Sequence, residues 1–314
     1  MEINKRYCKV IFEKLDEEGN TEDYREFENS LNVKFTYQRF LGNGMHSKGK
    51  ISICGLTQQA IDLYTSFLSQ DVEVTKRKTL KVIAGYEDEN KGIGTILSGS
   101  IITAVPTLPP DVWLNCEVIN QYEAKLQMNN YSFKGTKTLK EVIDWVATEI
   151  GLNKVENRIS NNTTYMNTEY KDFVFEGNKF DLVGRIGAMF YDKLAKQNIQ
   201  DKYNGISTYI EDNSLIVDYQ DLMIKDYSRW GIPKIASKDS EELKLVGLPQ
   251  PMWAGQAVTI TTLLNPSVKT GEVIELKNNL IKALNGYYYV FNITYNGEFR
   301  GTQWYSQFLC RRLQ

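Results

Sequence analysis

The chain has 314 residues, of which 37 are basic and 39 are acidic, so its formal net charge is only −2. This near balance excludes the clustered positive charge that tight binding to nucleic acid requires. No stretch approaches the roughly 20 apolar residues that cross a bilayer, and the first residues lack the apolar core of a signal peptide. We therefore expect a protein of several globular modules, made in a cytoplasm and not inserted in a membrane.

The N-terminal part is predicted to be a β-barrel module. Tyrosine (19) and phenylalanine (13) outnumber proline (7), which favours strands over helices. A switch to helical spacing over 56–64, with Thr57 placed to cap it, predicts one helix. Alternation of apolar and polar residues predicts strands over 6–13, 31–37, 50–54, 79–86, 94–105 and 111–128. We place the end of this module after the last of these strands, so it spans residues 1–130.

Residues 131–240 are predicted to be a small α+β insert. Apolar residues recur at helical period from Phe133 to Leu152, with Thr138 at the cap and Gly151 at the end, which predicts an amphipathic helix. A second helix is expected to begin near Asn178. Two strands, 205–210 and 214–218, follow it and predict a hairpin.

Residues 241–314 are predicted to be a second β-barrel module. The turn Asn285-Gly286 predicts a tight hairpin, because both residue types accept a positive φ. The expected strands are 243–248, 256–264, 272–276, 287–295 and 302–311. The predicted fold class is therefore α+β and mainly β, with two tandem β-barrel modules and a small α+β insert.

The chain offers little material for metal or redox chemistry. His46 is its only histidine, and it lies in the glycine-rich loop 42–47. A zinc site, an iron site or a histidine-based triad therefore has no spaced motif to build on. The cysteines at positions 8, 54, 116 and 310 form no CxxC pair, and we expect them to be free, buried thiols. We predict no metal site and no cofactor.

Carboxylates and aromatic side chains are the remaining candidates for a site. The close carboxylates are Asp16 with Glu18, Glu87 with Asp88 and Glu89, and Glu241 with Glu242. Each group lies in a polar, loop-like stretch, so we interpret it as solvated charge and predict no catalytic residue. Stacking on sugar rings is open to Trp253, Trp304 and the run Tyr287–Tyr289, although a core or a subunit interface is the favoured interpretation for them.

The C-terminal residues follow a characteristic order. A leucine-rich strand runs into an Asn-Pro corner, a glycine returns the chain, an Asn-Gly-Tyr-Tyr hairpin follows, and a glycine-bounded turn precedes a tryptophan strand. The residues that carry this order are Asn265, Pro266, Gly271, Asn285, Gly286, Gly297, Gly301 and Trp304. The order resembles the last domain of the baseplate hub proteins of contractile-tailed, myovirus-like bacteriophages. Glu298 stands where that family often has Asp, and Tyr295 lies near a position that is often His.

The first module resembles the same family more weakly. The segments that carry the resemblance are 31–37, 51–57 and 83–86 with 99–101. In that family the hub is structural and carries no catalytic group. Each chain supplies two barrel modules, and three chains form a ring of six similar barrels around an axis.

The resemblance implies where the protein works and what it contacts. It implies a homotrimer in the tail baseplate of a virion, made in the cytoplasm of a bacterial host. The implied partners are the tail tube protein, the central spike protein, the tape measure protein and baseplate wedge proteins. DNA is implied to pass through the bore without specific binding, and the eight motif residues are implied to be structural.

Two other functions stay open at this stage. The chain could be a carbohydrate-binding or receptor-recognition tail module, which a glycan array would test. It could instead be a peptidoglycan hydrolase, which would clear a zymogram until its carboxylates were changed to amides.

Overall fold

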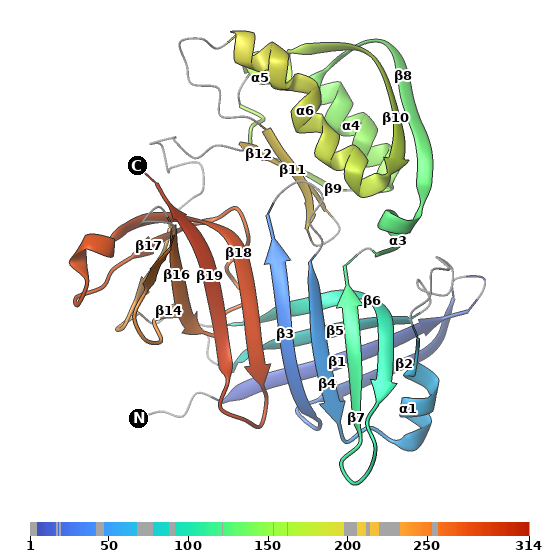
Figure 1. Cartoon of the computed structure of the whole chain (residues 1–314), viewed down its shortest axis with the longest axis vertical. Helices are drawn as coiled ribbons and strands as arrows, with labels where there is room; N and C mark the ends of the chain where they lie inside the picture. Colours follow the sequence, from blue (N-terminus) through green and yellow to red (C-terminus); the bar gives the residue numbers. More distant parts are fainter. Residues whose placement is uncertain are drawn as a thin grey trace. The chain divides into compact units, whose positions relative to one another are not determined.

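The computed structural model describes residues 5–16, 18, 20–41, 47–67, 78–87, 92–120, 122–152, 154–161, 163–197, 206–211, 214–219, 233–240, 242–252 and 257–313. The chain is mainly β, as predicted, and forms two compact units (Figure 1). Unit 1 comprises residues 1–40, 46–123 and 232–312, and unit 2 comprises 41–45, 124–231 and 313–314. The boundaries expected at residues 130 and 240 stay predictions, and the structure adds that unit 1 combines N-terminal with C-terminal strands.

The N-terminal part of unit 1 is an antiparallel sheet of seven strands. Its spatial order is β2-β1-β5-β6-β7-β4-β3. One helix, α1 (Gln58–Tyr64), interrupts it, and Thr57 caps this helix as predicted. The strands are β1 (Arg6–Leu15), β2 (Thr21–Glu28), β3 (Asn32–Phe40), β4 (Lys48–Cys54), β5 (Lys78–Tyr86), β6 (Ile93–Pro106) and β7 (Trp113–Ile119).

The C-terminal part of unit 1 adds seven more strands. They are β13 (Lys234–Ser237), β14 (Leu243–Lys244), β15 (Gln250–Met252), β16 (Ala257–Leu263), β17 (Val273–Leu276), β18 (Gly286–Glu298) and β19 (Trp304–Arg312). Strand β13 runs parallel to β14 and β17, whereas β15, β16, β19 and β18 form an antiparallel series.

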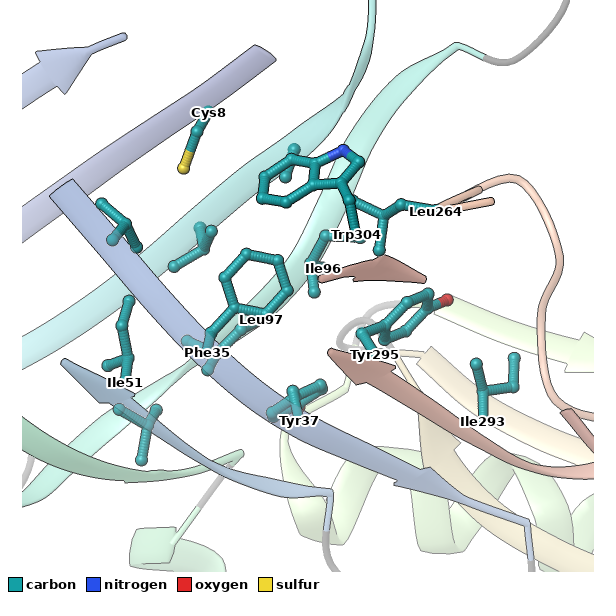
Figure 2. Packing of buried hydrophobic residues seen from close by; sticks show 14 of the residues in the cluster. Cys8, Phe35, Tyr37, Ile51, Ile96, Leu97, Leu264, Ile293, Tyr295 and Trp304 are labelled. Atoms are coloured by element: carbon teal, nitrogen blue, oxygen red, sulfur yellow. The ribbon is translucent and has the colours of Figure 1, made fainter. Parts of the chain in front are cut away.

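Strand β18 joins the two parts of unit 1 into one sheet. It pairs with β17, β19 and β3, and Tyr295 lies opposite Tyr37 in the β18–β3 pair. Figure 2 shows Phe35, Ile51 and Leu97 of the N-terminal strands in the same buried cluster as Trp304 and Tyr295. Because residues far apart in sequence share one hydrophobic core, neither end of the chain buries its apolar face alone.

Two local predictions for unit 1 need correction. The expected strand 111–128 divides into β7, the helix α3 (Tyr122–Leu126) and the start of β8. The Asn285-Gly286 pair is no two-residue turn, since Asn285 has a φ of −66° and only Gly286 is positive. Strands β17 and β18 do form a hairpin, but residues 277–285 connect them and contain the 3-10 helix η3 (Lys282–Leu284).

The run of three tyrosines also departs from simple alternation. Both Tyr288 and Tyr289 are buried, although neighbouring side chains of a strand point to opposite faces. A β-bulge between Val290 and Asn292 shifts the register against β19, and alternation resumes with Ile293. Strand β18 is therefore covered on both faces before the bulge.

Unit 2 contains two long helices and one short helix, together with two small sheets. The antiparallel pair is β8 (Met128–Thr138) with β10 (Glu169–Asn178), and the three-stranded sheet has the order β11-β12-β9. The predicted helices and hairpin are confirmed. The remaining elements are α4 (Leu139–Ile150), β9 (Lys154–Asn157), α5 (Thr163–Met166), α6 (Lys179–Gln197), β11 (Ile206–Glu211) and β12 (Ser214–Tyr219).

Helix α4 begins and ends where its sequence predicts. Thr138 and Glu141 form a reciprocal capping box, and Gly151 closes the helix with a φ of 75°. Phe133 was expected on this helix, but it lies on β8. There it stacks on Phe173 of β10 with ring centroids 5.7 Å apart.

A repeated pattern organises unit 2. The segments 131–136 (YSFKGT) and 173–178 (FVFEGN) both place two aromatic residues and a glycine before a helix. In the β8–β10 pair, Phe133 lies opposite Phe173 and Tyr131 opposite Phe175. Strands β8 and β10, which each precede a helix, therefore pair antiparallel. Two βα halves related by an approximate twofold rotation would pair in this way.

Candidate assembly site

The motif residue Trp304 lies at the centre of unit 1. Its side chain is fully buried, and its Nε1 donates to the carbonyl of Gly85 on β5 at 3.2 Å. Phe35 of β3, beside Trp304 in Figure 2, meets its ring edge-on at 5.5 Å between centroids. The Arg6 guanidinium lies 5.4 Å from the ring centroid. Trp304 therefore ties β19 to three N-terminal strands at once.

The glycine-bounded turn 297–301 is held by the same arginine. Arg6 donates to the carbonyls of Glu298 at 3.0 Å and Gly301 at 2.7 Å. A Cβ on Gly297 would lie 2.2 Å from Cζ of Phe35, and one on Gly301 would lie 2.2 Å from Oε2 of Glu298. Both glycines are required by close approach. The turn was expected from the sequence, but the role of Arg6 was not. No pattern near Arg6 indicates that it binds carbonyls almost three hundred residues away.

The Asn-Pro corner is a hydrogen-bonded junction. The Asn265 backbone N–H donates to Ser306 Oγ at 2.9 Å, its Nδ2 donates to the Glu242 carbonyl at 2.8 Å, and its Oδ1 accepts from the Ser267 N–H at 2.8 Å. Pro266 packs so closely on Gly94 of β6 that a Cβ there would lie 2.9 Å from the proline ring. This corner again joins the two ends of the chain.

The other three motif residues shape the connections to β18. Gly271 has a φ of 82° and donates its N–H to the Val290 carbonyl at 2.8 Å. Oδ1 of Asn285 accepts from the Asn278 N–H at 2.6 Å, and Gly286 opens β18 with a φ of 145°. The structure thus places all eight motif residues in unit 1 and gives each a backbone or packing role.

One buried arginine, Arg39, was not expected from the sequence. Arg39 of β3 is only 5% exposed, and it donates to the Thr95 carbonyl on β6 at 2.7 Å. Its guanidinium lies 5.7 Å from the ring centroid of Tyr295. A charge among apolar neighbours needs such partners. The alternation of β3 does place position 39 on the inward face, which was the available signal.

The path of strands in unit 1 ends at β2, whereas Leu245, directly after β14, forms a bridge with Thr262 of β16. Among the described residues, β2 pairs only with β1. Its outward side chains are acidic except for Tyr24, which is 54% exposed, and two of them form ion pairs, Glu26 with Lys9 and Glu22 with Lys14. An unpaired edge of this kind offers backbone groups to another strand.

The outer face of β18, β3, β4 and β7 is polar. Cross-strand contacts connect it, with Lys50 Nζ 2.9 Å from Glu117 Oε1 and Thr36 Oγ1 donating to Asn296 Oδ1 at 3.0 Å. A hollow of about 710 Å³ lies over β3, β4 and β7. Its charged groups are of both signs, Lys48 and Lys50 with Glu117.

The described residues form no constellation suited to catalysis. No group of three or more histidine, cysteine or acidic residues within them lies close enough to hold a metal ion. Burial raises the pKa of the Cys8 and Cys116 thiols to about 12, which makes them unreactive. Asp16 accepts from the N–H of Asn20 in an exposed turn. His46, Trp253 and the acidic residues 88, 89 and 241 lie outside the described residues.

Residues 8–310 match the baseplate hub gp41 family. The chain belongs to the baseplate hub gp41 family. No curated protein matches the chain. No helix within the described ranges is long and apolar enough to cross a membrane.

Solved structures share the fold of this hub protein. The 43 kDa tail protein of prophage MuSo2 from Shewanella oneidensis is 11% identical, with a TM-score of 0.54 over 97% of this chain and 96% of that chain. The tail protein from Neisseria meningitidis MC58 is 9% identical, with a TM-score of 0.59 over the same shares.

A third similar structure comes from a secretion system. The E. coli c3393 protein, described as a type VI secretion component similar to T4 tail proteins gp27 and gp5, is 8% identical. Its TM-score is 0.52 over 90% of this chain and 74% of that chain. Family and fold together identify a structural component of a phage tail baseplate.

Proposed function

We propose that the hub protein forms a homotrimeric ring that adapts the sixfold tail tube of a contractile tail to its threefold central spike. The observation that carries this proposal is the pairing of β18 with β3, which sets the N-terminal and C-terminal strands side by side in one sheet. Three copies would then present six strand sets around one axis. A threefold part would thereby match a sixfold one.

Exposed apolar side chains in unit 1 support association with other proteins. Leu108 is 86% exposed, Leu280 is 78% exposed and Phe67 is 74% exposed. Burial of such groups stabilises an interface. The partners proposed for these surfaces and for the sheet edges are a second copy of the chain, the tail tube protein, the spike protein, the tape measure protein and baseplate wedge proteins.

The polar outer face of β18, β3, β4 and β7 is the proposed channel lining. Its lysines are accompanied by Glu117, and Lys50 is already paired with it. A surface of mixed charge would not retain the phosphates of DNA that passes, because it releases few counterions. The tape measure protein, and later the genome, would move along this face without specific binding.

Sedimentation of the purified hub protein tests the ring. We expect a species of three times 36.1 kDa, and negative-stain images with a central opening. A monomer that stays soluble at micromolar concentration would contradict the proposal, because the surfaces described above would then need no partner.

The proposed role includes no catalysis. We expect purified protein to leave peptidoglycan in a zymogram intact. Clearing that disappears when Asp16 or Glu18 is changed to the amide would instead identify a hydrolase.

A further inference from the structure

A basic hollow lies in unit 1 where the start of β1 meets the turn between β18 and β19. It has a volume of about 770 Å³, and the described residues that line it are Lys5, Arg6, Asn29, Tyr86, Leu263, Phe299 and Arg300. Three of these seven residues are cationic and none of them is acidic. Charge of one sign beside apolar walls concentrates the electric field and attracts the opposite charge.

Two of the three cations in the basic hollow have no acidic partner among the described residues. Lys5 Nζ lies 2.8 Å from Oε2 of Glu87. Arg6 donates instead to two backbone carbonyls of the turn 297–301. Nη2 of Arg300 donates to a backbone carbonyl between β2 and β3 at 3.0 Å. Both guanidiniums therefore keep a positive charge that no carboxylate of the described chain contacts.

The charged groups of the basic hollow are accessible, and its wall is fixed. The side chain of Lys5 is 74% exposed, Arg300 is exposed and Arg6 is partly exposed. Asn29 donates its N–H to the Cys8 carbonyl, and its Oδ1 accepts from the Cys8 N–H, both at 2.8 Å. An acidic group from outside can therefore reach the guanidiniums with little reorganisation of the wall.

An acidic turn joins β1 to β2. The segment 13–22 contains five acidic residues and one lysine, so its formal charge is −4. The lysine, Lys14, lies 2.7 Å from Glu22, whereas Glu18 is exposed and forms no ion pair within the described residues. Hydrogen bonds across the base of the turn hold it in place. The acidic turn is thus complementary in charge to the basic hollow.

The acidic turn and the basic hollow lie at opposite ends of the same strand. Strand β1 begins at Arg6, which lines the hollow, and ends at Leu15, directly before the turn (Figure 1). A strand rises about 3.3 Å per residue, so roughly 30 Å separates the two surfaces and they cannot meet within one chain. They can meet between copies arranged head to tail, and a contact of this kind closes into a ring when the rotation between copies is a whole fraction of a turn.

We propose that the acidic turn of one copy docks in the basic hollow of the next copy, and that this contact joins the chains of the ring. Glu18 lies against Arg300, and the other carboxylates of the turn face Arg6. Apolar walls exclude water from these ion pairs and strengthen them. The inference rests on the proposed ring, and it names the two surfaces that form it. Each copy uses both surfaces, so neither stays free once the ring is closed.

Charge reversal in the full chain tests this contact. Arg300→Glu or Glu18→Arg alone sets like charges against each other, so the concentration at which half of the chains are assembled should rise at least about tenfold. The double variant, Arg300→Glu with Glu18→Arg, brings opposite charges together again. Its assembly should return to within about threefold of the parent chain, because the two substitutions act on one pair. Sedimentation equilibrium measures all four proteins.

A control separates this contact from a general effect of charge. Lys269→Glu changes the net charge by the same amount as Arg300→Glu but lies outside the basic hollow, so it should leave assembly unchanged. Misfolding of one single variant would not be repaired by a second substitution at the far end of β1. Rescue in the double variant therefore identifies a contact between copies.

The outcomes distinguish the contact from the ring. A parent trimer that tolerates both single reversals would overturn the contact, leave the ring standing and leave the basic hollow to another acidic partner. A double variant that assembles no better than the single variants would also overturn the contact. A parent chain that stays monomeric would contradict the ring itself, and the contact with it.

Discussion

Unit 1 and unit 2 differ in how far apart in the sequence their segments lie. Unit 1 combines both ends of the chain, and its β18–β3 pair joins residues more than two hundred positions apart, such as Tyr295 and Tyr37. Unit 2 is almost one continuous segment, in which a strand is followed by a helix three times. Pairing of strands that are distant in sequence costs more chain entropy than pairing of neighbouring strands. Unit 1 therefore depends on a few contacts that hold its distant parts together.

This difference predicts how substitutions should destabilise each unit of the hub protein. In unit 1, one tryptophan, one arginine and one Asn-Pro corner connect strands from the two ends of the chain. In unit 2, the apolar faces of α4 and α6 share a core with short loops between their elements. Substitutions in unit 1 should therefore separate the ends of the chain, and those in unit 2 should remain local.

The largest effect is expected for Trp304→Ala. Truncating a fully buried aromatic residue typically costs about 3 to 5 kcal/mol. The truncation also removes the hydrogen bond to the Gly85 carbonyl and the contact of the ring with the Arg6 guanidinium. Hydrogen exchange measured by mass spectrometry should show faster exchange in β5, β3 and β19 together, while peptides of unit 2 keep their protection.

Two further substitutions serve as controls for Trp304→Ala. Trp304→Phe keeps the ring against Phe35 but loses the bond to Gly85, so its loss should be smaller. Tyr289→Ala removes another buried ring of β18 and should weaken the same unit. If Trp304→Ala accelerates exchange equally in both units, the division into independently stable units is wrong.

In unit 2 the largest effect is expected for Asp218→Ala. Its carboxylate is 1% exposed and lies 3.3 Å from Nη1 of Arg158, which also contacts Glu156 at 2.9 Å. The substitution leaves Arg158 with the more exposed Glu156 as its acidic partner, and loss of the buried partner of an ion pair costs about 3 kcal/mol. Chemical denaturation followed by hydrogen exchange should show the loss in β12 and β9 and no change in unit 1.

The double substitution Asp218→Leu with Arg158→Met is the matched control. It removes both charges, so it should be less destabilising than Asp218→Ala alone. A double variant that is worse than the single one would show that the pair is required for more than charge balance.

The two units also differ in how far sequence patterns predict them. The capping box of Thr138 with Glu141 and the terminating Gly151 are local signals, and they locate α4 to the residue. The hairpin of β11 and β12 likewise follows from adjacent residues. Phe133 was misplaced because its spacing fits a helix, whereas its partner Phe173 lies on another strand.

Unit 1 shows what such patterns leave open. Alternation predicted most of its strands, but it carries no record of which strand pairs with which. The contacts of Arg6 with the turn at Gly301, and of Arg39 with Thr95, depend on that pairing. The motif residues were recognised through a family resemblance, and their packing roles became clear only from the three-dimensional neighbours.

A smaller effect in unit 1 is expected for Gly297→Ala. The added Cβ would lie 2.2 Å from Cζ of Phe35, and that ring is held in place by Trp304. Overpacking of this kind costs about 1 to 3 kcal/mol. Thermal denaturation of the single variant and of Gly297→Ala with Phe35→Leu checks it, because the smaller side chain makes room. The double variant should lose less than the sum of the two single losses.

The smallest effect is expected in unit 2 for Thr138→Ala, which removes half of the capping box of α4. The loss should be about 1 kcal/mol, seen as faster exchange in the first turn of α4, and Thr138→Ser should restore most of it.

The Thr138 backbone N–H and hydroxyl hold the pKa of the Glu141 carboxyl below its ordinary value. A lowered folded-state pKa gives a contribution that is present above the unfolded-state pKa and lost as the pH falls through the folded-state value. The other half of the box therefore persists at neutral pH in Thr138→Ala, and Glu141→Gln should remove this acid dependence from exchange in α4 while leaving exchange in unit 1 unchanged.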